Sequence, residues 1–116
     1  MKRDLNLIRT LLQKIEAEQS LTVAGITRVT IDFQLLLMIE AGLILGAQYR
    51  EGNELNNTTH VLVQRLTNKG YDFLELSRSQ KLWTRFLTKA AKAGGGMTIE
   101  LASEVLHSWL KRLILK

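Results

Sequence analysis

The stretch that decides the fold is residues 27–44, TRVTIDFQLLLMIEAGLI. Thr27 suits a helix N-cap because its hydroxyl can accept a hydrogen bond from a backbone amide of the first turn. Apolar residues follow at helical spacing, and Gly42 is a typical C-terminal stop since glycine adopts a left-handed backbone without strain. The stretch predicts a helix from Thr27 to about Ala41 that leads directly into an apolar strand.

A second helix is predicted on the N-terminal side of this stretch. Asp4 can cap it, and it should end near Gln19. Its apolar residues recur at helical spacing, at Leu5, Ile8, Leu12 and Ile15. Residues 21–23 predict a short strand, and Gly25 breaks the chain before the next helix.

On the C-terminal side, residues 43–49 and 60–66 predict two strands. The polar segment between them, residues 50–59, is rich in Asn and Gly, which is typical of a loop. The two strands therefore predict a hairpin with a long tip. A capped helix followed by such a hairpin is typical of winged-helix domains.

Three further helices are expected over residues 67–76, 80–93 and 98–116, with Thr67 and Thr98 as caps and Gly94–Gly96 between the last two. The predicted order is α-β-α-β-β-α-α-α. The expected fold is α+β, mostly α, with a winged-helix-like domain (α-β-α-β-β) followed by C-terminal helices. Residues 1–116 should form a single domain whose helical extension begins at about residue 67.

Composition narrows the class of protein. The chain has no Cys, which excludes disulfides and Cys-based zinc sites. Residues 35–47 are the most apolar run, but Glu40 interrupts them and they are too short to span a bilayer. No secretory signal precedes them. We expect a cytoplasmic protein that does not insert in a membrane.

Charge is unevenly placed along the chain. The net charge is +5; residues 1–58 hold six Lys/Arg and seven Asp/Glu, whereas residues 59–116 hold ten Lys/Arg and four Asp/Glu. The C-terminal half is therefore where an anionic partner would be attracted.

Three motifs carry a resemblance: MKRDLNLIR at residues 1–9, LLMIEAGLI closing residues 25–44, and RLTNKGYDFL at residues 65–74. The chain resembles a family of uncharacterised bacterial and phage proteins, winged-helix in fold, whose members open MKRDxxLIR. It departs from them at Phe33-Gln34, where members often carry Tyr-His, and at Asn68 and Tyr71, where they carry Trp and His. The resemblance implies the fold and no established activity.

The helix at 28–41 would be the DNA-reading helix of a winged helix, with its N-terminal half against base edges. Arg28, Thr30 and Gln34 are the candidate base contacts. A second interpretation is a core helix, because Val29, Phe33 and Leu36 add a second apolar stripe to the first. That stripe is covered either by the chain's own helices or by a second chain. Exposure of the stripe would favour a partner protein, and a basic face continuous with Arg28 would favour DNA.

The helix at 80–93 carries the clearest charge pattern. Its cations fall within about 80° of arc, opposite its apolar face; they are Arg78, Lys81, Arg85, Lys89 and Lys92. No acidic residue occurs between Glu75 and Glu100. The stripe is a candidate for contacts with the phosphate backbone of double-stranded DNA. A solvated helix surface is the alternative.

The last helix, residues 98–116, has a wide apolar surface that includes Trp109 and Leu113. This surface either closes the helical layer of its own domain or forms an interface with a second copy or a partner protein.

Nothing in the sequence indicates catalysis, a metal or a cofactor. His60 and His107 are the only histidines, and no nucleophile or phosphate-binding motif occurs. The leading prediction is a non-enzymatic winged-helix protein that binds DNA as a regulator, mainly by backbone contacts. The alternative is a protein-interaction or dimerisation module on the same frame.

Overall fold

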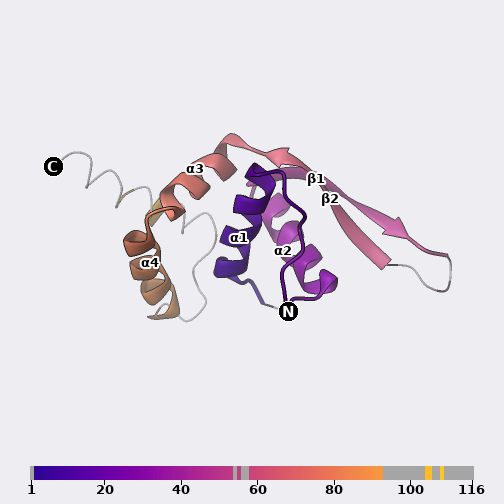
Figure 1. The fold of residues 1–116 in the computed structure, drawn as a ribbon, viewed down its shortest axis with the longest axis horizontal. Coiled ribbons are helices and arrows are strands. Elements are labelled where there is room, and N and C mark those ends of the chain that lie inside the picture. Colours follow the sequence, from indigo (N-terminus) through magenta and orange to yellow (C-terminus); the bar gives the residue numbers. More distant parts are fainter. Residues whose placement is uncertain (1, 54, 56–57, 93–103, 106–107, 109–116) are drawn as a thin grey trace. The chain divides into compact units, whose positions relative to one another are not determined.

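The computed structural model describes residues 2–53, 55, 58–92, 104–105 and 108, and they form an α+β, mostly helical protein (Figure 1). Its main elements are α1 (Leu5–Glu16), α2 (Arg28–Glu40), β1 (Ile44–Glu51), β2 (Thr58–Leu66), α3 (Asn68–Ser77) and α4 (Gln80–Lys92). The chain divides into two compact units, residues 1–70 and 71–116. In the described part of the chain, no helix has the length and apolar character needed to cross a bilayer.

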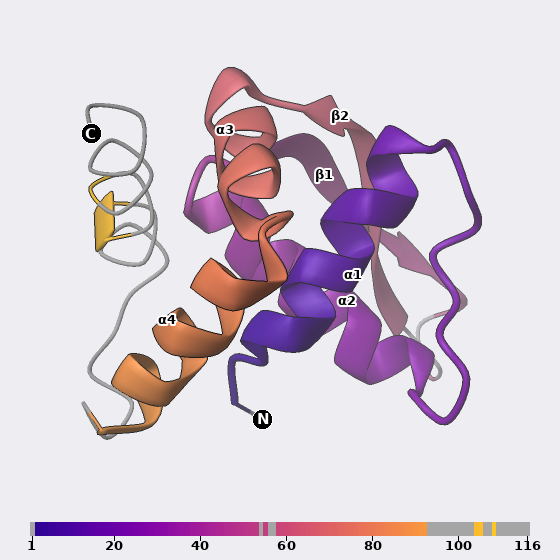
Figure 2. The same cartoon turned by 60° about the vertical axis from the view of Figure 1, so that its left-hand side comes forward.

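The first unit consists of two helices against one end of a hairpin. α1 and α2 lie side by side and both contact β2, while α2 also contacts β1 (Figure 2). The other end of the hairpin extends beyond the helices (Figure 1). The core of this unit is almost entirely aliphatic; it includes Ile8, Leu11, Leu12, Leu35, Met38, Leu43, Ile44 and Leu66.

Side-chain caps begin the helices where the sequence predicts them. Asp4 accepts a hydrogen bond from the Leu7 amide at 3.1 Å, and Thr27 accepts one from the Thr30 amide at 3.3 Å. Thr67 caps α3 in the same way, through the Gly70 amide at 3.0 Å. Each cap satisfies an amide that has no partner within its own helix.

The hairpin is antiparallel, as predicted, with a register shift between Leu45 and Gly46. Gly42 ends α2 with a φ of 77°, which fits its predicted role as a helix stop. At Gly46 the two strands approach so closely that a Cβ would lie 2.5 Å from the carbonyl oxygen of Leu62. A side chain at this position would therefore push the strands apart.

Several predicted boundaries are wrong. Both strands extend into residues 50–59, the predicted loop, because β1 and β2 stay paired as far as Glu51 and Thr58. Residues 21–23 form no strand; the Ile26 amide bonds to the Val23 carbonyl at 3.0 Å, so this segment turns locally instead of joining the sheet. The described order is α-α-β-β-α-α. α1 ends at Glu16 rather than near Gln19, because Glu18 adopts a left-handed φ of 55°. Most of the predicted helix at 98–116 lies outside the described residues.

In the second unit, the apolar face of α4 is buried. Trp83 meets Phe73 edge-on, with ring centroids 6.1 Å apart, and lies 5.3 Å from the ring of Phe86. Leu82, Trp83 and Phe86 are all buried. The side of α4 opposite these residues is therefore the side that carries its charge.

Candidate functional site

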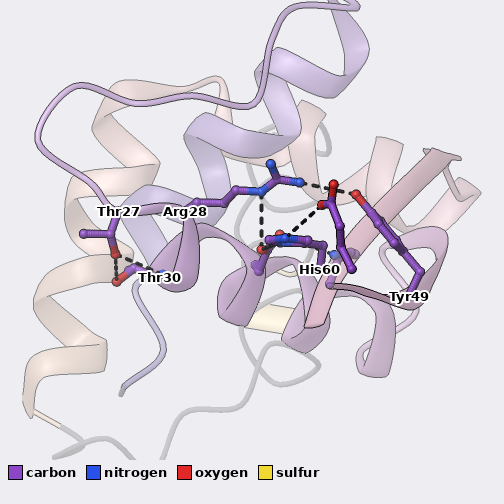
Figure 3. Close-up of polar contacts among 8 residues, drawn as sticks. Thr27, Arg28, Thr30, Tyr49 and His60 are labelled. Carbon is purple, nitrogen blue, oxygen red and sulfur yellow. Dashed lines mark hydrogen bonds and ion pairs between the residues drawn. The ribbon is translucent and has the colours of Figure 1, made fainter. Parts of the chain in front are cut away.

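A cluster of polar side chains, which includes Arg28, Tyr49 and His60, joins α2 to the hairpin (Figure 3). Asp32 makes the contacts at its centre. The Oδ2 atom of Asp32 lies 3.0 Å from Nδ1 of His60, on β2. Its Oδ1 atom accepts a hydrogen bond from the Val61 amide at 3.4 Å. The carboxylate of one α2 residue thus engages two successive residues of β2.

Arg28 and Tyr49 extend this cluster to β1. The Nε atom of Arg28 lies 3.7 Å from Oδ2 of Asp32, one helical turn away. Its Nη2 group donates to the Tyr49 hydroxyl at 3.3 Å (Figure 3). Tyr49 pairs with His60 across the strands, and their ring centroids are 5.6 Å apart. Glu51 of β1 contacts the other ring nitrogen of His60. These five residues form the hairpin cluster: Arg28, Asp32, Tyr49, Glu51 and His60.

His60 has a carboxylate at each of its ring nitrogens. Glu51 lies 3.3 Å from Nε2, opposite the Asp32 contact at Nδ1. Because a carboxylate only accepts, both contacts are hydrogen bonds only when the ring carries both protons. The His60 and Asp32 side chains are just 12% and 13% exposed, whereas Glu51 is 68% exposed. The Nδ1 contact ties the hairpin to α2, and the Nε2 contact joins β2 to β1.

A cavity of about 410 Å³ opens beside the hairpin cluster. The loop between α1 and α2 contributes Ser20, Leu21, Thr22 and Ile26 to its wall, and α2 and the hairpin supply the rest, including Arg28, Asp32 and Tyr49. Its size falls within the range of small-molecule pockets. All of its lining residues belong to the first unit.

Gln34, a predicted base contact, is buried rather than presented at the surface. It is 1% exposed. Its amide donates to the Lys2 carbonyl at 2.8 Å and accepts from the Asp4 amide at 2.9 Å. The prediction for Gln34 is therefore inconsistent with the structure, because both ends of its amide hold the N-terminal segment against α2.

The other two predicted base contacts are also engaged within the protein. The Thr30 hydroxyl accepts a hydrogen bond from the Thr27 hydroxyl at 3.0 Å. Arg28 is exposed but contacts Asp32 and Tyr49. The structure does not place Arg28, Thr30 and Gln34 together on one open surface.

The predicted apolar interface is divided. Val29 is 59% exposed, whereas Phe33 and Leu36 are half-buried. Trp109 and Leu113 lie outside the described residues. Of the expected interface residues that the structure describes, Val29 alone is largely open to solvent.

The predicted basic stripe lies at the surface of the second unit. Its five residues are all exposed, and they are Arg78, Lys81, Arg85, Lys89 and Lys92. Arg78 forms an ion pair with Glu75 at 2.8 Å. Arg78 lies in the turn between α3 and α4, and the other four residues are on α4. We call these five residues the basic face of α4. The buried Leu82, Trp83 and Phe86 fix its orientation, since they hold the opposite side of the helix in the interior.

The hairpin cluster is absent from the sequence-based prediction. Pairing of the two predicted strands could have placed Tyr49 near His60. Nothing local indicates that Asp32 meets His60, since 28 residues separate them. Within the described residues, no group of three or more His, Cys, Asp or Glu side chains could hold a metal ion. Elsewhere in the first unit, desolvation by burial lowers the pKa of Arg9 from its ordinary value.

Comparison with known proteins identifies the family. Residues 2–96 match the family described as hypothetical protein DUF2513. The chain belongs to the DUF2513 family. An uncharacterised protein of Haemophilus influenzae (strain Rd) is 25% identical to this DUF2513 protein over 121 residues, covering 98% of this chain and 99% of that protein. No solved structure matches. These findings confirm the expected membership of an uncharacterised family.

Proposed function

We propose that this DUF2513 protein is a non-enzymatic regulatory protein that binds double-stranded DNA through backbone contacts. The observation that carries the proposal is the basic face of α4, where four exposed cations of the helix lie opposite its buried apolar side and Arg78 just precedes them. Cations at this spacing can follow a phosphate backbone, and each neutralised phosphate releases a counterion.

Helix electrostatics do not account for the whole basic face. Lys89 and Lys92 lie in the last turn of α4, where the helix dipole favours positive charge. Lys81 is in the first turn, where the same dipole disfavours it. Lys81, Arg85 and Lys89 also repel one another at four-residue spacing. A bound phosphate would add a favourable interaction at each of these positions.

The order of a capped helix, a tight turn and a hairpin supports a winged-helix-like frame for the first unit. Its α2 helix is poorly suited to reading bases, because Gln34 is buried and Arg28 is engaged by Asp32 and Tyr49. The proposal therefore assigns affinity to backbone contacts, which carry no direct sequence information. We expect binding with little preference among duplex sequences.

The test is fluorescence anisotropy of a labelled mixed-sequence duplex across a salt series. The wild type is compared with a triple variant of the basic face, Lys81→Glu/Arg85→Glu/Lys89→Glu. A matched control, Lys2→Glu/Arg3→Glu/Arg65→Glu, makes the same change in net charge at exposed positions elsewhere. Circular dichroism establishes that each variant is folded.

We expect wild-type binding that weakens steeply with salt, loss of binding in the basic-face variant, and binding retained in the control. Absence of binding at low salt would refute the proposal. Equal losses in the two triple variants would show a response to net charge alone and would also count against the basic face.

A second candidate function is a protein-interaction or dimerisation module, which the 59% exposure of Val29 favours. When a partner covers an apolar side chain that is exposed on a helix surface, the free energy of the complex is lowered. Sedimentation velocity over a concentration series tests it. We expect self-association in the wild type and a monomer in Val29→Glu, with Gln48→Glu as an exposed control. A wild type that is monomeric at all concentrations rules out the homodimer.

A further inference from the structure

The cavity beside the hairpin cluster has an apolar interior. Ile31 and Leu35 of α2 line it and are 4% and 2% exposed. Val61 and Val63 of β2 also line it and are half-buried. Two further lining residues, Ile26 and Leu62, are 36% and 66% exposed. An apolar ligand that covers these two side chains removes their surface from water, which favours binding.

The polar groups at the cavity present hydrogen-bond donors. The Tyr49 hydroxyl accepts from Arg28 at 3.3 Å, so its own proton can be donated to a ligand. A guanidinium has more N–H groups than the contacts with Asp32 and Tyr49 use. Arg28 can therefore bind a further acceptor without releasing either residue.

Asp32 also lines the cavity, but its carboxylate is already coordinated by the protein. Oδ1 accepts from the Val61 amide, and Oδ2 faces His60 and Arg28. Each of its two oxygens thus already has a partner within the protein, and Arg28 is close enough to offset part of its charge. Arg28 and Tyr49 therefore offer unused donors at the cavity, and a carboxylate is the acceptor that a guanidinium binds best.

We propose that this cavity binds a small organic acid. The apolar body of the acid lies against Ile31, Leu35 and Val63, and its carboxylate accepts from Arg28 and Tyr49. The proposal is independent of DNA binding, because the lining residues all belong to residues 1–70 and the basic face belongs to α4. It gives the protein a ligand site in addition to its proposed DNA surface.

The experiment is a titration of ¹⁵N-labelled full-length protein followed by amide chemical shifts. The probes are 3-phenylpropionate and octanoate, each compared with its neutral amide, 3-phenylpropanamide and octanamide. The variants are Arg28→Gln, which removes the cation, and Tyr49→Phe, which removes the hydroxyl alone. Arg50→Gln is the matched control for Arg28→Gln. Arg50 is exposed on β1, next to Tyr49, and does not line the cavity.

A further variant, Thr22→Trp, fills the cavity from an exposed wall position without altering the core. The comparison of each acid with its amide uses the wild-type protein alone. It therefore tests whether the cavity prefers a carboxylate even if Arg28→Gln does not fold.

We expect saturable shifts of the lining amides with at least one acid, and affinity about tenfold lower or worse for its amide and for Arg28→Gln, as loss of a charged hydrogen bond implies. Tyr49→Phe and Thr22→Trp should weaken binding, and Arg50→Gln should not. Absence of saturable shifts at millimolar acid would overturn the proposal. So would equal affinity for acid and amide, or shifts confined to α4.

Discussion

At the scale of single residues, Gly70 shows packing overriding helix propensity. It lies in the first turns of α3, where an added Cβ would collide with the backbone carbonyl of Leu43. Propensity alone favours alanine by about 1 kcal/mol. Because a backbone oxygen cannot move aside as a flexible side chain can, we expect Gly70→Ala to lower the free energy of unfolding by about 2 kcal/mol. Urea denaturation measures this.

Asn68→Ala is the matched control for this substitution, since Asn68 is an exposed residue in the first turn of the same helix and the change adds no bulk against Leu43. It should leave the free energy of unfolding within about 0.5 kcal/mol of the wild type. If Gly70→Ala is as stable as this control, the backbone near Leu43 shifts to make room for the added Cβ with little loss of stability.

Gln34 provides a second residue-scale prediction. Its side chain bonds to the backbone of Lys2 and Asp4, so Gln34→Leu keeps the bulk and leaves a carbonyl and an amide without this partner. We expect a loss of about 1–3 kcal/mol in the free energy of unfolding. Hydrogen exchange of the Asp4 amide should also accelerate.

The exposed Gln48 allows the same chemical change outside the core. Gln48→Leu should alter neither the stability nor the exchange of the Asp4 amide. Unchanged exchange in Gln34→Leu would mean that the amide is protected by something other than the glutamine.

At the scale of elements, the hairpin cluster attaches the sheet to α2. Asp32→Ala removes the acceptor that Val61, His60 and Arg28 share. We expect a loss of about 1–3 kcal/mol from the groups left without it. A double-mutant cycle with His60→Ala isolates the pairwise term. Glu40→Ala, at an exposed position of the same helix, is the control. A coupling energy of zero between Asp32 and His60 would contradict the attachment of the hairpin to α2 through this pair.

The helices could be predicted because their signals are local. Asp4, Thr27 and Thr67 each cap a helix through a bond that spans three residues. A strand lacks such a signal, since its partner decides whether it forms. Residues 21–23 have strand composition, yet they turn locally through Val23 and Ile26.

The two candidate sites differ in the same way. The basic face could be predicted because helical periodicity alone places Lys81, Arg85 and Lys89 on one side. Burial of Gln34 depends on where the N-terminal segment crosses α2, and the Asp32–His60 contact depends on how the hairpin packs. Both contacts depend on tertiary packing, which cannot be predicted from the spacing of residues along the chain.

At the scale of the whole molecule, the proposed DNA surface depends on uneven charge. If α4 follows a phosphate backbone, each cation that contacts a phosphate contributes about 0.9 to the slope of log affinity against log salt concentration. We therefore expect Arg85→Gln to reduce the magnitude of this slope by about one. Anisotropy titrations at several salt concentrations measure it.

Arg3→Gln, in the half of the chain that is net negative, serves as the control for this slope. Its slope should equal that of the wild type. Equal reductions in the two variants would indicate a diffuse electrostatic attraction without a defined surface.

The Asp32–Val61 contact has a further consequence for the sheet. Each strand of a two-stranded sheet has one open edge, and amides on that edge can pair with a foreign extended chain. At Val61 the carboxylate of Asp32 accepts the amide, as the carbonyl of a third strand would. Without this carboxylate, the edge of β2 would gain an unpaired donor and become a template for strand addition, so loss of Asp32 would promote aggregation as well as instability.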